Sequence, residues 1–277
     1  MDVESKIVLT TASGAPVAPL GLAARGDAFR EAVPIAAERG VNLFFTYGPG
    51  KGGWTSAIAE VAARRREEIF IATGTGSRRP QYMRASLRKY ARAIGTDYLD
   101  VFFVEYAQPW EDLEPVFAPG GALDELVACK EEGLIRHVGA TAHDRALSRR
   151  LAEDPRVDVL MQRYNMAHRK AADEVFPACR RHGKPIVAFT ATRWGSLMEG
   201  HAEWVEAAPS AAECYRFCMA HPDIAVTLSA PASAAELDEN LAVLEQPPMT
   251  AAARDHWKRY GDLVYGDGTG RFETEWP

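Results

Sequence analysis

The chain repeats one unit along most of its length: a short apolar run, then a segment whose apolar residues recur at helical spacing. The apolar runs predict strands, at 17–22, 41–45, 69–73, 98–106, 137–141, 157–162, 186–190 and 224–228. The helical spacing predicts helices, at 27–38, 54–66, 80–94, 123–132, 146–153, 171–182, 210–220 and 233–244. Strands that alternate with helices form parallel sheets with right-handed crossovers, and eight such units close into a barrel. We therefore expect an α/β fold, a (β/α)8 TIM barrel.

Two further segments flank the repeating units. Ser13-Gly14 separates two short apolar runs, 7–9 and 17–22, and predicts an N-terminal hairpin or plug before the first barrel strand. An amphipathic pattern from about Thr250 to Leu263 predicts an extra C-terminal helix, followed by a glycine-rich tail. A length of 277 residues suits one barrel, commonly about 250 residues, so we expect a single domain over 1–277.

Residues at the predicted helix ends support these boundaries. Pro80 falls at a first helical turn, where its missing N–H costs nothing, and Gly95 follows the last turn of the same helix. Ser233 and Glu236 have the spacing of a capping box at the start of the eighth helix.

One predicted strand ends on a carboxylate. Val101–Val104 is an unbroken apolar run, as expected for a parallel strand covered on both faces, and Glu105 follows it directly. Barrels place their chemistry at the carboxyl ends of their strands. Glu105 is therefore the first candidate for an acid or base.

Charge and composition narrow the class of partner. The formal net charge is −6, so no basic excess points to nucleic acid. No apolar run approaches the roughly 20 residues of a membrane span, and residues 1–6 lack the apolar core of a secretory signal. We expect a cytoplasmic protein with a small-molecule partner, and leave open whether it forms a homo-oligomer.

The cysteines give no sign of a metal or redox site. Cys214 and Cys218 are close in sequence, whereas Cys129 and Cys179 are isolated. The chain shows no His, Cys, Asp and Glu set with metal-ligand spacing, so no metal site is predicted. The thiols are interpreted as buried packing groups.

Several blocks of sequence resemble the aldo/keto reductase superfamily. Gly40–Thr46 resembles the motif G-[IV]-N-x-[FI]-D-T, and Ser86–Val101 resembles S-L-x-R-L-G-T-D-Y-[IL]-D-L. Leu123–Thr141 resembles L-x-E-G-K-I-R-x-I-G-[VL]-S. Gln162–Asn165 resembles Q-x-x-Y-N, and Leu237–Leu241 resembles L-x-E-N-L. Their order and spacing match from about Val17 to Leu244. The resemblance implies the barrel fold and a carbonyl reductase that uses NADPH and an Asp, Tyr, Lys, His tetrad.

The residues at the tetrad positions differ from that pattern. Phe45 stands at the Asp position, Gly74 at the Lys position and Glu105 at the His position, and only Tyr47 keeps its residue type. A phenol of pKa near 10 is a poor proton donor unless a neighbouring cation lowers that pKa. We expect Glu105 to be the acid or base, in apolar surroundings that raise its pKa, and Tyr47 to be its hydrogen-bond partner.

The resemblance also places a cofactor site. Gln162 and Asn240 keep the family's residue types there, and Ser229 and Ser233 lie at the last strand end and the following helix start. Ala232 and Glu236 stand where basic or amide residues bind the 2′-phosphate, and a carboxylate repels a phosphate. Thr141-Ala142 replaces the Ser-Asn pair that binds the nicotinamide amide. These cofactor residues matter only if a dinucleotide binds.

Six further residues are predicted to contact the substrate. They lie at or near strand ends on the carboxyl face, and are Phe45, Trp54, His143, Gln162, Arg193 and Trp194. Arg193 with Trp194 resembles a clamp for a carboxylate or an aromatic ring. Arg193 is also the arginine that topology places nearest to Glu105.

The sequence therefore predicts an enzyme that acts on a small carbonyl- or hydroxyl-bearing molecule by non-redox acid/base catalysis, such as isomerisation, elimination or cyclisation, with no cofactor required. One alternative is an NADPH-dependent carbonyl reductase with a non-standard tetrad. A second is a non-catalytic binding or regulatory subunit.

Overall fold

The computed structural model describes residues 7–24, 29–47 and 52–268. The strands in these ranges are β1 (Leu20–Ala23), β2 (Leu43–Thr46), β3 (Phe70–Thr75), β4 (Leu99–Ala107), β5 (Ile135–Ala142), β6 (Val159–Arg163), β7 (Ile186–Phe189) and β8 (Ile224–Ser229). They pair in parallel and in chain order, and β1 pairs with β8, so the sheet closes into a barrel. This confirms the predicted (β/α)8 fold.

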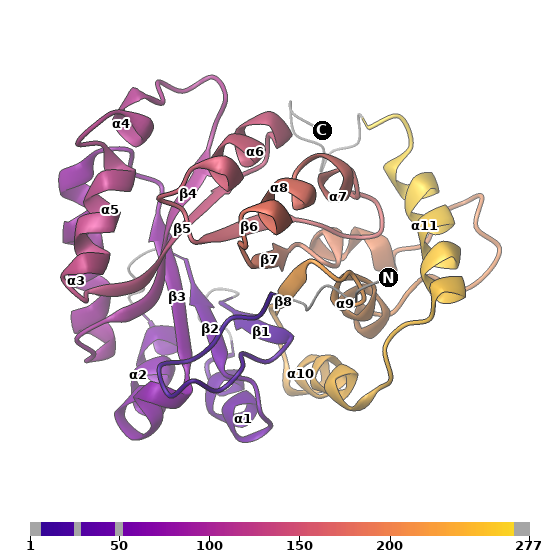
Figure 1. The fold of residues 1–277 in the computed structure, drawn as a ribbon. Helices are drawn as coiled ribbons and strands as arrows, with labels where there is room; N and C mark the ends of the chain where they lie inside the picture. Colours follow the sequence, from indigo (N-terminus) through magenta and orange to yellow (C-terminus); the bar gives the residue numbers. More distant parts are fainter. Residues whose placement is uncertain (1–6, 25–28, 48–51, 269–277) are drawn as a thin grey trace.

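Helices surround the strands (Figure 1). They are α1 (Ala32–Glu38), α2 (Gly53–Arg65), α3 (Pro80–Ile94), α4 (Glu114–Phe117), α5 (Ala122–Glu131), α6 (Arg145–Glu153), α7 (Ala171–Glu174), α8 (Phe176–Arg181), α9 (Ala211–Met219), α10 (Ala234–Leu241) and α11 (Ala251–Tyr265), with 3-10 turns η1 (Arg66–Glu68), η2 (Arg193–Met198) and η3 (Ala242–Glu245). Pro80 opens α3 and Gly95 ends it in the left-handed conformation, as predicted.

Three helical segments differ from the prediction. The helix expected over 171–182 is divided at Val175 into α7 and α8, and Pro177 lies in the first turn of α8, where it cannot donate an N–H to the preceding turn. The helix expected from Asp27 begins at Ala32, and 27–28 lie outside the described residues. The short helix α4 was not predicted.

Two apolar layers form the core. Outward-facing strand residues such as Phe102 and Val104 pack against the helices, whereas inward-facing residues such as Phe45, Phe103 and Phe189 fill the barrel. This alternation is what the two-residue period of a strand requires. The barrel interior is therefore packed with side chains below the carboxyl ends of the strands.

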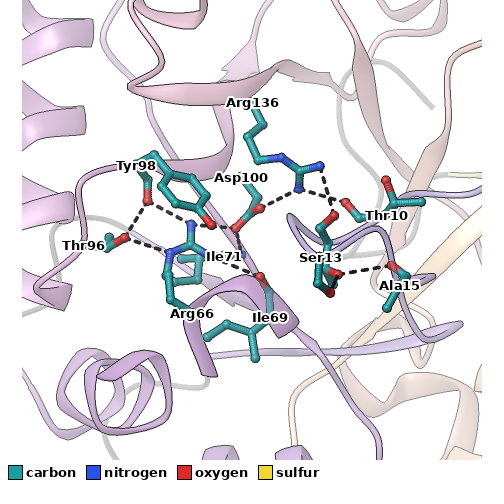
Figure 2. A network of polar contacts seen from close by, with 11 residues as sticks. Thr10, Ser13, Ala15, Arg66, Ile69, Ile71, Thr96, Tyr98, Asp100 and Arg136 are labelled. Atoms are coloured by element: carbon teal, nitrogen blue, oxygen red, sulfur yellow. Dashed lines mark hydrogen bonds and ion pairs between the residues drawn. The ribbon is translucent and has the colours of Figure 1, made fainter. Parts of the chain in front are cut away.

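An ion-pair network closes the opposite end of the barrel (Figure 2). Asp100, at the start of β4, is buried and lies 2.8 Å from guanidinium nitrogens of both Arg66 and Arg136. Arg136 also donates to the carbonyl oxygens of Thr10 and Thr11. These bonds hold the N-terminal turn, whose predicted hairpin consists of a single antiparallel bridge between Thr10 and Pro16, against the barrel.

Helix α11 packs against the loops that follow β6 and β7. A Cβ atom on Gly261 would lie 1.9 Å from the carbonyl oxygen of Met166, so only glycine permits this close approach. Tyr260 donates a hydrogen bond to the carbonyl oxygen of Leu197 over 2.7 Å. The extra C-terminal helix therefore borders the carboxyl end of the barrel, where the candidate site lies.

Candidate functional site

A β-bulge at the end of β4 brings two consecutive side chains to the mouth of the barrel. Val104 pairs with Ala140, but Ala107 pairs with Ala142, so β4 carries one residue more than β5 over this stretch. Tyr106 takes up the extra length with φ at 51°, in the left-handed region. Glu105 and Tyr106 both lie toward the barrel axis, although neighbouring strand residues normally point to opposite faces.

Arg78, in the loop between β3 and α3, binds this bulge. Its guanidinium donates to the carbonyl oxygen of Glu105 over 2.7 Å and to that of Tyr106 over 2.6 Å. Its Nε lies 2.7 Å from a carboxylate oxygen of Glu111. One side chain thus satisfies both carbonyl groups at the irregular end of the strand.

Glu105 lies at the centre of the site. It is 6% exposed, and its Oε1 atom has no hydrogen-bond partner among the described residues. Burial raises the pKa of Glu105 to about 7, although the positive charge of Arg78 opposes this shift. The protonated form of this carboxyl group is therefore available near neutral pH, unlike that of an ordinary exposed glutamate.

Tyr47 follows β2 on the same side of the barrel. It is 42% exposed, and its ring meets the edge of Phe45 at a centroid distance of 4.6 Å. Partial desolvation of the Tyr47 side chain raises its pKa, a hydrogen bond from Tyr106 opposes this rise, and the charge of Glu105 adds to it. Tyr47 is thus a weaker acid than a free tyrosine.

No lysine of the described ranges shifts the pKa of the Tyr47 hydroxyl. The side chains that shift the pKa of Tyr47 are Tyr106 and Glu105. Lys51 lies outside the described residues.

The position that the resemblance assigns to lysine has no room for a side chain. A Cβ atom on Gly74 would lie 2.5 Å from the carbonyl oxygen of Phe103 and 2.8 Å from Cγ of Glu105. Real Cβ atoms essentially never approach other atoms within 3.0 Å. Atoms of β4 therefore occupy the space that a lysine side chain would need, and only glycine fits at this position without a shift of its neighbours.

His143 joins the Glu105 region to a neighbouring cleft. Its ring stacks on Tyr106 at a centroid distance of 5.4 Å and meets the edge of Phe189. Burial lowers the pKa of His143 to about 4, helped by the charge of Arg163, so the imidazole is neutral at physiological pH. The cleft is lined by His143, Arg145, Gln162, Arg163, Ala167, His168, Arg169, Lys170, Ala171, Asp262 and Tyr265.

Gln162, Ser229 and Asn240, three of the predicted cofactor residues, are buried at the ends of β6 and β8 and on α10. Asn240 donates from its side-chain nitrogen to the Ser229 hydroxyl over 2.9 Å. The amide oxygens of Gln162 and Asn240 have no hydrogen-bond partner within the described part of the chain. Buried acceptors of this kind suit a ligand that brings N–H or O–H donors.

The start of α10 is occupied by a carboxylate. Ser233 caps the helix by accepting from the backbone N–H of Glu236, as predicted. The capping box is only half formed, because the Glu236 carboxylate accepts from the backbone N–H of Ala232, over 2.8 Å, instead of that of Ser233. The complete box lies at Ser210 and Glu213, at the start of α9.

Three predicted substrate residues, Trp54, Arg193 and Trp194, are placed by the packing of α2 and the loop after β7. Trp54 is 3% exposed between α2 and the sheet, and its indole N–H donates to the carbonyl oxygen of Phe45. Arg193 donates to the carbonyl oxygen of Val264 in α11, over 2.9 Å, and Trp194 is largely exposed. The arginine that acts on Glu105 is Arg78, not Arg193 as topology suggested.

Sequence reasoning missed Arg78 and Tyr106. Tyr106 follows Glu105 directly, and regular strand alternation would turn it to the outer face. Arg78 is one of two adjacent arginines before Pro80, and nothing local marks it as bound to β4. The bulge that recruits both residues depends on the pairing of β4 with β5, which the sequence does not display.

Two features are absent from the described residues. No helix there has the length and apolar character of a membrane span. No group of three or more His, Cys, Asp and Glu side chains in those ranges is arranged to hold a metal ion.

Comparison with known proteins places this chain in a family. The model of the aldo/keto reductase family matches residues 27–207, more than half of the sequence. The chain therefore belongs to the aldo/keto reductase family, which confirms the resemblance of its sequence blocks.

The individual relatives and solved structures share only a low sequence identity with this chain. The NADH-specific methylglyoxal reductase of Escherichia coli K12 is 26% identical over 122 residues, which cover 43% of this chain and 35% of that relative. A holo aldo-keto reductase from Bacillus halodurans superposes with a TM-score of 0.74 at 20% identity, over 92% of this chain and 96% of that one. A Klebsiella pneumoniae aldo-keto reductase in complex with NADPH gives 0.69 at 15% identity, over 92% and 94%. At such identities the structural likeness shows the fold.

Proposed function

We propose that this chain is an enzyme that reduces a small carbonyl compound, and that Glu105 gives the proton to the carbonyl oxygen. The observation that carries this proposal is the buried Glu105 carboxyl group, whose pKa is raised to about 7 beside the hydroxyls of Tyr47 and Tyr106. Reduction was the alternative to the non-redox chemistry expected from the sequence. The comparisons do not support that first expectation, because the named relative is a reductase.

The proton donor follows from the relative acidities in the site. Reduction turns a carbonyl oxygen into an alkoxide, which takes a proton from the strongest acid within reach. A carboxyl group of pKa about 7 is a far stronger acid than Tyr47, whose pKa is raised above 10. Glu105 therefore donates the proton, while the two tyrosine hydroxyls orient the carbonyl oxygen by hydrogen bonding.

The buried polar groups at the ends of β6 and β8 suit a nicotinamide dinucleotide. The unpartnered amide oxygen of Gln162 suits the carboxamide N–H groups, and Asn240 with Ser229 offers further contacts at the end of β8. When bound, the nucleotide supplies the hydride.

Two residues near the start of α10, Ala232 and Glu236, favour NADH over NADPH. Glu236 places a carboxylate at the start of α10, where the resemblance assigns the 2′-phosphate, and Ala232 supplies no positive charge. A ribose hydroxyl donates to a carboxylate, whereas a phosphate is repelled by it.

Nucleotide titration and turnover test this proposal. We expect NADH to quench the protein fluorescence and to bind more tightly than NADPH, and Glu236→Arg to reverse that preference. The wild type should oxidise NADH with methylglyoxal or other small aldehydes, and Glu105→Gln should lower kcat by roughly 10²- to 10⁴-fold. Glu68→Gln is the matched control, because Glu68 is exposed and paired with Arg65. A wild type that binds neither nucleotide would refute the proposal.

A second candidate is the non-redox acid/base chemistry expected from the sequence. It is favoured by Phe45 at the family's Asp position and by Gly74 at its Lys position, where the packing leaves no room for a side chain. Turnover of a hydroxy-carbonyl compound without any nucleotide, abolished by Glu105→Gln, would favour this chemistry over reduction.

A further inference from the structure

The end of β4 has a backbone conformation that the strand alone does not stabilise. Tyr106 adopts a left-handed φ, which a bulky residue rarely takes unless surrounding contacts hold it. The register shift also leaves β4 out of step with β5 between Val104 and Ala107. The contacts that maintain this bulge come from outside the sheet.

Arg78 supplies those contacts. Its two terminal nitrogens donate separately to the carbonyl oxygens of Glu105 and Tyr106, and its Nε binds Glu111. The Arg78 side chain is 14% exposed, so these bonds are shielded from water. A planar guanidinium can donate in three directions at once, which a lysine ammonium on a flexible chain does not reproduce in the same geometry.

The bulge determines which side chains reach the mouth of the barrel. With regular alternation, Glu105 would face the axis and Tyr106 would face the helices. In the bulge, the hydroxyls of Tyr106 and Tyr47 are hydrogen-bonded to each other. The Tyr106 ring stacks on His143 and packs edge-on against Phe189. The carboxyl group and the second phenol therefore share one side only because the strand is irregular.

We propose that Arg78 is a positioning residue of this site: by binding the carbonyl oxygens of Glu105 and Tyr106, it maintains the bulge that places both side chains beside Tyr47. Arg78 itself acts through the backbone. The inference rests on the proposed function for its catalytic consequence, but its structural consequence is measured in the ligand-free protein.

Three variants test the inference. Arg78→Lys keeps the positive charge and loses the forked bonds, whereas Arg78→Met loses both. Arg84→Met is the control, because Arg84 on α3 is also partly buried and paired, with Glu125 and Glu132, but lies away from the bulge. Thermal melting of each variant reports general stability.

Two readouts follow the site itself. The ring protons of His143, assigned by their loss in His143→Gln, report by NMR whether Tyr106 still stacks on that ring. Infrared difference spectra report the titration of the Glu105 carboxyl group, assigned by its loss in Glu105→Gln.

Tyr106→Leu, which lacks the stacked ring, serves as the reference for a lost stack. We expect both Arg78 variants to shift the His143 resonances toward those of Tyr106→Leu and to lower kcat by roughly 10- to 100-fold. The midpoint of Glu105 should rise by about one pH unit in Arg78→Met, because an opposite charge is removed, and stay near 7 in Arg78→Lys. Arg84→Met should leave all of these values unchanged.

Two results would overturn the inference. If Arg78→Lys matches the wild type in resonances and kcat, Arg78 acts by its charge alone. If both variants melt earlier but keep the His143 resonances, Arg78 only stabilises the fold. Arg78→Lys decides the matter alone if Arg78→Met fails to fold. Retained turnover in Glu105→Gln would refute the proposed function instead, and the His143 readout does not depend on turnover.

Discussion

Substitution of Gly74 by alanine tests whether β4 closes the position that the resemblance assigns to lysine. The added Cβ atom would lie 2.5 Å from the carbonyl oxygen of Phe103, 2.8 Å from Cβ of the same residue and 2.8 Å from Cγ of Glu105. Ordinary contacts of such atoms begin near 3.4 Å. Two of the three neighbours cannot rotate away, because the carbonyl oxygen and Cβ of Phe103 are fixed by the β4 backbone.

The expected cost is that of overpacking a rigid core. Such insertions lower the free energy of unfolding by about 1–3 kcal/mol. At about 2–4 °C per kcal/mol, the melting temperature should fall by roughly 2–12 °C. Chemical denaturation and calorimetry measure both quantities.

Gly76→Ala is the matched control for this substitution. A Cβ atom on Gly76, two residues further along the chain, would meet nothing within 4 Å. We expect this control to change the free energy of unfolding by less than about 0.5 kcal/mol. If Gly74→Ala is as stable as Gly76→Ala, the packing that excludes a lysine side chain is not as the structure describes.

Two further predictions concern stability. Asp100→Asn should lower the free energy of unfolding by roughly 3–5 kcal/mol, because it leaves Arg66 and Arg136 without their buried carboxylate. Denaturant titrations measure this loss, and a loss below about 1 kcal/mol would contradict the role of Asp100. The folded state lowers the pKa of His143 to about 4, so the unfolded chain binds its proton first as pH falls. The free energy of unfolding of the wild type should therefore fall from about pH 6.5 to pH 4 more steeply than that of His143→Asn. If denaturation at pH 7.5 and at pH 5 shows the same loss of free energy in both proteins, this assignment is refuted.

The barrel was predictable because its signals are local. Apolar runs, helical spacing and end residues such as Pro80 and Gly95 each report the state of a few neighbouring residues. Val175 shows where local reasoning ends, since the helical spacing continues through the point where α7 and α8 separate.

The candidate site was only partly predictable. Glu105 was found because the carboxyl end of a buried strand is a defined place in a barrel. The directions of Trp54 and Arg193 depend on how α2 and α11 dock, and Arg78 reaches the site through a bulge set by strand pairing. Interactions between distant segments thus decide which residues near the strand ends share the site.

Titration of the Glu105 carboxyl group is the measurement that tests the proposed proton donor most directly. Infrared difference spectroscopy of the ligand-free wild type across pH 4–9, with Glu105→Gln as reference, isolates the signal of this one carboxyl group. We expect a protonated carboxyl band that disappears with a midpoint near 7. A midpoint near 4, the ordinary value for an exposed glutamate, would mean that Glu105 is ionised at neutral pH and is not the proton donor.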